Sequence, residues 1–204
     1  QETSALYELT RGLSAVRGIG KMADTAISLL ADVYRMEIVL FVAEQDGISL
    51  HPKTASADDV KEASVARWVI QNGQLAGRNT DTLPSARGLY VPLMAEGQIL
   101  GALGVLPENV DYLFGGNDIN RLETYASLIA SAFQRARRAE EAERTKLESE
   151  SQKLKNVLLS SVSHDLRTPL ASITGAASSA LMLRDLLPAA AIELLGSIHG
   201  QAAR

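Results

Sequence analysis

Four residues near the end of the chain are of types and spacing that could do chemistry together: His164, Asp165, Thr168 and Pro169. An imidazole is largely uncharged at neutral pH and can attack through one ring nitrogen while a neighbour holds the other. Asp165 could accept a hydrogen bond from the ring N–H, as a general base or as an orienting group. Thr168 follows His164 by one helical turn, so its hydroxyl would lie on the same face, where it could position a water molecule.

Pro169 predicts a bend beside these groups. It cannot donate a hydrogen bond to the carbonyl of Asp165, and its ring crowds that carbonyl, so a kink should start next to His164. We therefore treat Pro169 as a candidate hinge through which movement of the preceding helix changes access to His164.

The apolar pattern around His164 places its ring on the outside of a helix. Leu154, Leu158, Val162 and Leu166 follow one another in steps of four and mark an apolar stripe. His164 comes two residues after Val162, about 200° around the helix. We expect this side chain to be open to a docking partner, although a lone exposed histidine is more often an ordinary surface residue.

A single long helical pattern carries these residues. After Gly115-Gly116, Asn117 or Asp118 can cap a helix that runs with few breaks to about Leu183. Apolar residues recur along it at heptad spacing, which is typical of a coiled coil, in two sets: Ile119, Ala126, Phe133, Leu147 and Leu154, with Leu122, Ile129, Ala136 and Val157. Glutamates occupy the seam in its centre, where we expect a solvated, adjustable stretch.

Residues 184–188 predict a turn into a second helix, whose Ile192, Leu195 and Ile198 would face back to the first. Two such helical hairpins would form a four-helix bundle, so the pattern predicts a homodimer. The second helix ends too early to be complete, and the chain begins without Met. We expect it to be part of a longer protein.

The first half of the chain has an α+β order. Helices at residues 4–16 and 22–33 precede a strand at 38–42. The turn signal at Asp46-Gly47 predicts a hairpin in which residues 48–51 form the second strand. Asp58 or Asp59 can cap a third helix that ends at Asn72-Gly73, and a loop at 77–87 follows. Strands at 88–95 and 98–106 flank Glu96-Gly97. Such an order predicts an antiparallel sheet with helices.

This order resembles that of GAF domains. Several local sequences look like the GAF domains of the KdpD family, the sensor histidine kinases of potassium homeostasis: Trp68-Val69, Asn72-Gly73-Gln74, Ala76-Gly77-Arg78, TDTLP at 80–84 and LYVPL at 89–93. The octet SHDLRTPL at 163–170 resembles the H-box of histidine kinases. In that context the resemblance implies that His164 is a phosphoacceptor and that Thr168 serves dephosphorylation.

The resemblance implies three parts: a GAF sensory domain at 1–116, a signalling coiled-coil helix at 117–156, and a partial dimerisation and histidine phosphotransfer domain at 157–204. The intact protein would be a bacterial inner-membrane, two-component sensor histidine kinase, of which this chain is a cytoplasmic fragment. ATP with Mg²⁺ would be held by a downstream domain of the same kinase, and phosphate would pass to a KdpE-like response regulator. Because the chain has no glycine-rich phosphate loop or Walker lysine, it should not autophosphorylate alone.

Composition removes several other classes of function. The net charge is −4 and no long basic run occurs, which disfavours nucleic acid as a partner. The absence of cysteine excludes disulfides, thiolate metal sites and covalent bilin attachment. No apolar run reaches the length of a membrane span, and no His-x-x-x-His spacing predicts a metal site.

Two questions stay open at the level of the sequence. The ligand of the GAF domain is unknown: Trp68 with Arg67 and Arg78 could line an anion-binding cleft, but a single Trp on an apolar helix face is more often core, and the signature of cyclic-nucleotide-binding GAF domains is absent. The chain could also be a noncatalytic GAF and coiled-coil sensory module with an inert H-box, or a relay acceptor served by a kinase in trans.

Overall fold

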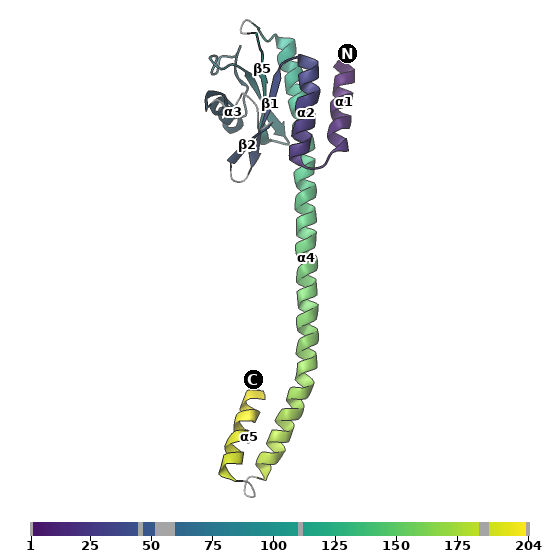
Figure 1. Ribbon diagram of the computed structural model, residues 1–204, viewed down its shortest axis with the longest axis vertical. Helices are drawn as coiled ribbons and strands as arrows, with labels where there is room; N and C mark the ends of the chain where they lie inside the picture. Colours follow the sequence, from purple (N-terminus) through teal and green to yellow (C-terminus); the bar gives the residue numbers. More distant parts are fainter. Residues whose placement is uncertain (1, 45–46, 52–59, 110–111, 184–187, 203–204) are drawn as a thin grey trace. The chain divides into compact units, whose positions relative to one another are not determined.

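The computed structural model describes residues 2–44, 47–51, 60–109, 112–183 and 188–202 (Figure 1). The chain divides into two compact units, Gln1–Ala142 and Glu143–Arg204, which are treated separately below. Within the described parts, none of the helices is both long and apolar enough to cross a membrane.

The first unit is an α+β fold built on one antiparallel sheet, as predicted. Its elements are α1 (Glu2–Ala15), α2 (Ile19–Tyr34), β1 (Glu37–Glu44), β2 (Gly47–His51), α3 (Val60–Asn72), β3 (Ala76–Gly77), β4 (Leu89–Ala95), β5 (Gln98–Leu106) and the first turns of α4 (Gly116–Met182). The strand order is β2-β1-β5-β4-β3.

Both predicted hairpins form, but the central pairing of the sheet joins distant strands. β1 pairs with β2, and β4 with β5, while β1 and β5 meet in the middle with Leu40 opposite Leu103. Gly77, predicted as the first residue of a loop at 77–87, instead ends the short strand β3, where it pairs with Leu89 of β4. The turn at Asp46-Gly47 and the cap at Asp58 or Asp59 fall wholly or partly outside the described residues.

Glycines allow two close approaches that shape this sheet. Glu96 and Gly97 both have positive φ, 49° and 79°, which is the geometry of a tight two-residue hairpin turn. On β5, a Cβ at Gly104 would lie 2.5 Å from Cε1 of Tyr90, its cross-strand partner. The absence of a side chain at Gly104 therefore lets the Tyr90 ring lie flat over the strand.

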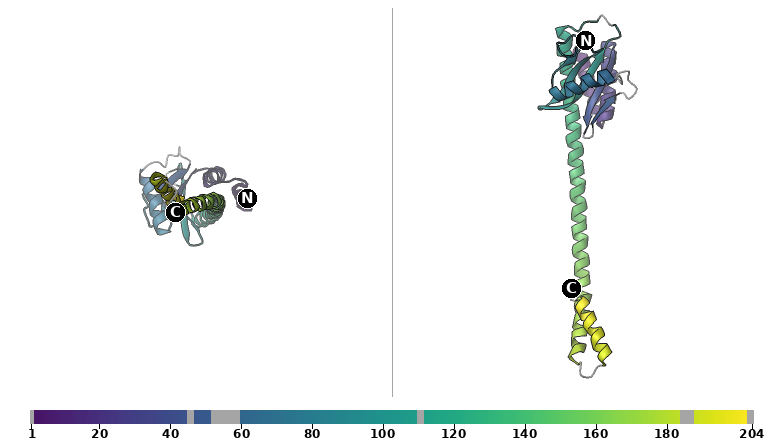
Figure 2. Two further views of the ribbon diagram at one scale, coloured as in Figure 1. Left: turned by 90° about the horizontal axis from the view of Figure 1, so that it is seen from below. Right: turned by 90° about the vertical axis from the view of Figure 1, so that its left-hand side faces the viewer.

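Each face of the sheet has its own core. Along β1, alternate residues point to opposite sides: Leu40 packs with α1, α2 and α4, while Phe41 packs with α3. Figures 1 and 2 show the sheet lying between α3 on one side and α1, α2 and the beginning of α4 on the other. The buried face of α2 comprises Ala23, Ala26 and Leu30, whereas Val33, near the end of the helix, is 48% exposed.

The first turns of α4 belong to this core. Leu122, Ala126, Ile129 and Phe133 are at most 1% exposed and pack in the cluster formed with α1, α2 and the sheet. The sequence assigned them to a coiled-coil seam. Their heptad spacing has a different cause here, because a helix that covers a sheet also needs one continuous apolar face.

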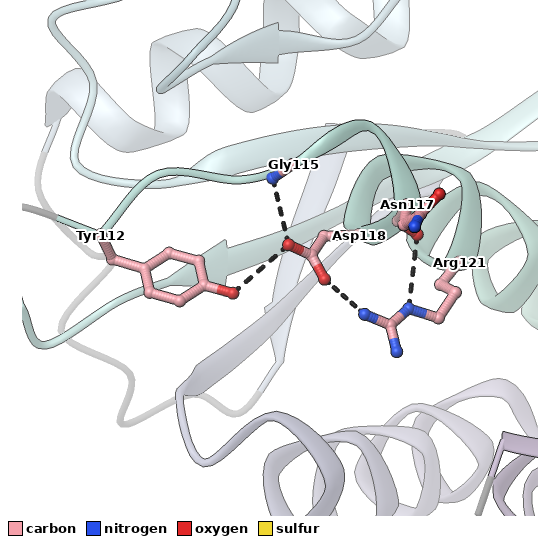
Figure 3. Close-up of polar contacts among 5 residues, drawn as sticks. All are labelled: Tyr112, Gly115, Asn117, Asp118 and Arg121. Carbon is pink, nitrogen blue, oxygen red and sulfur yellow. Dashed lines mark hydrogen bonds and ion pairs between the residues drawn. The ribbon is translucent and has the colours of Figure 1, made fainter.

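Asp118 caps α4 from inside the helix (Figure 3). Its carboxylate accepts a hydrogen bond from the backbone N–H of Gly115 at 3.1 Å and pairs with Arg121 at 2.5 Å. Tyr112 approaches the same carboxylate at 3.5 Å. An acidic residue in the first turn that reaches back to the residue before the helix satisfies a free backbone donor and complements the helix dipole.

The second unit contains the rest of α4 and the shorter helix α5 (Ala189–Ala202), which lie side by side in Figures 1 and 2. Ala177 of α4 is 3% exposed, and Ile192 and Leu195 of α5 are half-buried, as expected for helices that face each other. Ile198, predicted on the same face, is 38% exposed. The carbonyl of Pro188 accepts hydrogen bonds from Ala191 and Ile192, so Pro188 lies just before the helix. Most of the predicted turn lies outside the described residues.

Candidate functional site

The octet at residues 163–170 lies within α4, and its key side chains are open to solvent. The side chain of His164 is 80% exposed and that of Asp165 is 76% exposed. Every residue from Arg138 to Ile173 is exposed in the single chain. The ring of His164 is therefore accessible to a partner, as the helical pattern predicted.

Asp165 lies beside one nitrogen of the His164 ring. Nδ1 of His164 is 3.5 Å from Oδ1 of Asp165, at the long limit of a hydrogen bond. A carboxylate at Nδ1 favours the tautomer that carries the proton there, which leaves the lone pair on Nε2. In that tautomer Nε2 is the ring nitrogen with a free lone pair.

Thr168 and Pro169 lie one turn further along the same helix. Thr168 is exposed, and its backbone carbonyl accepts a hydrogen bond from Ser172 at 3.2 Å. The helix continues through Pro169 without ending. Figure 1 shows that α4 changes direction in its yellow-green part, within the second unit.

A groove runs along α4 next to this site, on the side toward the end of α5. It has a volume of about 680 Å³ and is lined by Ser163, Leu166, Arg167, Leu170, Ala171, Thr174 and Ala202. Leu166 and Leu170 are 54% and 40% exposed, and Val157 and Val162 of the same helix are 65% and 53% exposed. A helix with this much open apolar surface needs a covering partner.

The possible anion-binding residues of the first unit have different surroundings. Trp68 is half-buried and packs against the α3 side of the core, as the core alternative predicted. Arg67 is exposed, and the Nε of Arg78 donates to the backbone carbonyl of Tyr112 at 3.1 Å. Arg78 therefore ties the loop after β3 to the segment that precedes α4.

A buried carboxylate in this unit was not predicted. Glu62 on α3 is 2% exposed and accepts hydrogen bonds from the backbone N–H groups of Arg87 and Gly88, at 2.9 and 3.3 Å, and from the hydroxyl of Tyr90 at 2.7 Å. Burial, and then the hydrogen bond to Glu62, raises the pKa of Tyr90. The signal was available in the sequence, because Glu62 lies one turn before the buried Val65 and Ala66.

No group of three or more acidic or histidine side chains that could hold a metal occurs among the described residues. Among the described residues, the exposed octet on α4 and the buried Glu62 network on α3 are two separate polar arrangements.

Comparison with known proteins agrees with both halves of this arrangement. The GAF domain family matches residues 19–135, and the His Kinase A (phospho-acceptor) domain matches residues 154–204. The crystal structure of the GAF domain of the potassium sensor histidine kinase KdpD from Escherichia coli superposes with a TM-score of 0.58 at 25% identity, over 69% of this chain and 98% of that one.

Whole-sequence relatives point the same way. The chain is 30% identical to the sensor protein KdpD of Escherichia coli over 178 residues, which are 87% of this chain and 20% of that protein. It is 28% identical to the KdpD sensor protein of Clostridium acetobutylicum over 196 residues, which are 92% of this chain and 22% of that protein. The chain thus spans about a fifth of the length of the curated relatives it matches.

The sheet with its helices, the exposed histidine on the long helix and the two family matches lead to one conclusion. The chain belongs to the GAF domain family, its residues 154–204 match the His Kinase A (phospho-acceptor) domain family, and over most of its length it is similar to the KdpD sensor proteins.

Proposed function

We propose that this chain is the phosphoacceptor part of a two-component sensor histidine kinase, in which His164 receives phosphate from ATP and passes it to an aspartate of a response regulator. The observation that carries this proposal is the exposed His164 ring, with Asp165 at Nδ1, in the segment that matches the phospho-acceptor domain. An exposed side chain suits a nucleophile that must meet two macromolecular partners in turn.

The residues of the octet have separate roles in this proposal. Asp165 holds the proton on Nδ1 and so directs Nε2 toward the phosphoryl group, and it can take up the Nδ1 proton once Nε2 has formed its bond to phosphorus. Thr168, one turn away, positions the water that hydrolyses phosphohistidine or the phosphoaspartate of the regulator. Pro169 is the hinge that couples the preceding helix to access at His164.

ATP and Mg²⁺ belong to a separate domain of the same kinase in this proposal, since the chain itself offers no phosphate-binding loop. ATP supplies the phosphoryl group when that domain docks. The chain supplies the acceptor ring, its orientation and the open helix face on which the domain sits.

The open apolar face of α4 supports a homodimer. The regulator is proposed to be KdpE-like, by extension from the KdpD relatives. By the same extension, the whole protein would lie in the bacterial inner membrane, with this segment on the cytoplasmic side. The division at residues 116 and 156 also stays a proposal. No small-molecule ligand is assigned to the GAF domain.

A labelling experiment tests the acceptor role. The chain is mixed with the separately produced ATP-binding domain of the same kinase and γ-labelled ATP, and His164→Gln is compared with wild type and with His199→Gln, which changes a histidine on α5. We expect acid-labile, base-stable label on wild type and on His199→Gln, and none on His164→Gln. A folded dimer that takes up no label in the presence of an active ATP-binding domain would favour the noncatalytic sensory module instead.

A further inference from the structure

Two consecutive arginines hold α4 at the point where it leaves the core of the first unit. Arg137 donates from Nη2 to the backbone carbonyl of Ala43, near the end of β1. Arg138 binds both carboxylate oxygens of Glu96, with Nη1 to Oε1 at 3.2 Å and Nη2 to Oε2 at 2.5 Å. Phe133 and Gln134, just before them, are buried, and from Arg138 onward the helix is exposed as far as Ile173.

The two contacts reach different parts of the sheet. Consecutive residues on a helix point about 100° apart, and Arg137 and Arg138 contact different groups. Ala43 lies at the β1 end that joins β2, and Glu96 lies at the tip of the β4–β5 hairpin. Both contacts form together only in one rotational setting of α4 on the sheet.

The Glu96 carboxylate is placed by the turn that carries it. Glu96 has φ 49° in a two-residue turn with Gly97, and this backbone geometry sets the direction in which its Cα–Cβ bond leaves the turn. The hydrogen bonds to Glu96, and then its charge, raise the pKa of Arg138. A forked arginine–carboxylate pair is specific in geometry. Because this pair is exposed, at 61% for Arg138 and 63% for Glu96, water and salt keep it weak enough to open.

We propose that Arg137 and Arg138 form an arginine latch that sets the rotational register in which α4 leaves the GAF domain, and that opening the latch changes the rate at which His164 takes up phosphate. α4 is one continuous helix from the latch to His164, so a change of register at the latch is carried along the helix backbone. The latch itself rests only on the contacts within the first unit. The effect on His164 rests on the function proposed above.

Hydrogen exchange on the intact chain tests the latch without phosphorylation. The variants are Arg138→Glu, Glu96→Arg and the charge-swapped double variant, with Arg135→Glu as the control on an exposed position of the same helix. We expect amides at 134–142 to exchange about two- to fivefold faster in each single variant, and to recover in the double variant. Equal effects of Arg138→Glu and Arg135→Glu, or no recovery in the double variant, would overturn the latch.

Arg137→Gln tests the second contact, and Trp68 fluorescence checks that each variant keeps a folded GAF unit. We expect Arg137→Gln to accelerate exchange in the same segment, because the shorter glutamine side chain loses the hydrogen bond to the backbone carbonyl of Ala43. Unchanged exchange in this variant would reduce the latch to the single pair with Glu96 and refute the two-point register.

Phosphorylation of the intact kinase tests the coupling. We expect the initial rate of label uptake at His164 to change by about twofold or more in Arg138→Glu, and to return toward wild type in the double variant. If hydrogen exchange shows that the latch is open in Arg138→Glu but the rate of label uptake at His164 is unchanged, the coupling is refuted. If wild type itself takes up no label at His164, the proposed function and the coupling fall together, while the exchange experiment still decides whether the latch exists.

Discussion

Removal of the Glu62 side chain should be among the most damaging single changes in the GAF unit. In Glu62→Ala, three donors lose their common acceptor: the backbone N–H groups of Arg87 and Gly88, and the hydroxyl of Tyr90. Gly88 and Tyr90 are buried, so water cannot readily replace the lost carboxylate. The change also detaches α3 from the loop that leads into β4.

The magnitude follows from these three contacts. Hydrogen bonds to a charged group contribute about 1.5–3 kcal/mol each, and a buried donor left without a partner costs about 1–3 kcal/mol. These terms overlap, and the wild-type carboxylate has already lost its hydration, so their full sum does not apply. We expect the free energy of unfolding to fall by about 4 kcal/mol, a large part of the about 5–15 kcal/mol typical of a domain.

Urea unfolding followed by Trp68 fluorescence measures this change, because the single Trp lies on α3 and packs in the same half of the core. With a slope of about 2 kcal/mol per molar urea, the midpoint should fall by about 2 M. Gln71→Ala, at an exposed position of the same helix, should shift it little. A loss below about 1 kcal/mol in Glu62→Ala would refute the view that this buried network holds α3 in place.

Three further outcomes follow from other sites. The hydroxyl of Tyr34 is buried without a hydrogen-bond partner, so Tyr34→Phe should raise the free energy of unfolding by about 1 kcal/mol in the same urea assay. Burial raises the pKa of Tyr34 and of Tyr90, so the unfolded chain loses these protons at a lower pH than the folded chain does. The GAF unit should therefore keep its stability below about pH 10 and lose stability as the pH rises further. A lower urea midpoint at about pH 11 than at about pH 8 would show this loss. Pro169→Ala should straighten α4 beside His164 and alter the balance between kinase and phosphatase output, and unaltered switching in a reconstituted assay would refute the hinge.

The hairpins illustrate what could be predicted well. The pair Glu96-Gly97 was enough to predict the turn between β4 and β5, because a two-residue turn with positive φ at both positions depends on few neighbouring residues. The end of α3 is similar: Gly73 adopts φ 67°, and its N–H donates to the carbonyl of Val69 at 2.8 Å. Short-range patterns of this kind are complete within a few residues of sequence.

The beginning of α4 shows where prediction from spacing ended. Its apolar residues recur every seven positions whether they pack against a partner helix or against a sheet, so the pattern alone could not separate a coiled coil from a core helix. The fold places Leu122, Ile129 and Phe133 in the GAF core. Asn117 or Asp118 was expected to cap this helix, and Asp118 does so from the first turn, because its carboxylate reaches back to Gly115.

Sequence alone determined the α+β class, the two hairpins, the long helix and the octet around His164, because each rests on residues close together in the chain. Tertiary structure decided which distant groups meet: β1 beside β5, Glu62 beneath the backbone of Arg87 and Gly88, and Arg138 on Glu96. The residues in these contacts lie far apart in the sequence, from 25 positions for Glu62 and Arg87 to 94 positions for Ala43 and Arg137. Local sequence preferences cannot indicate such pairs, because these contacts become stable only when the packing of the whole domain excludes other arrangements of the chain.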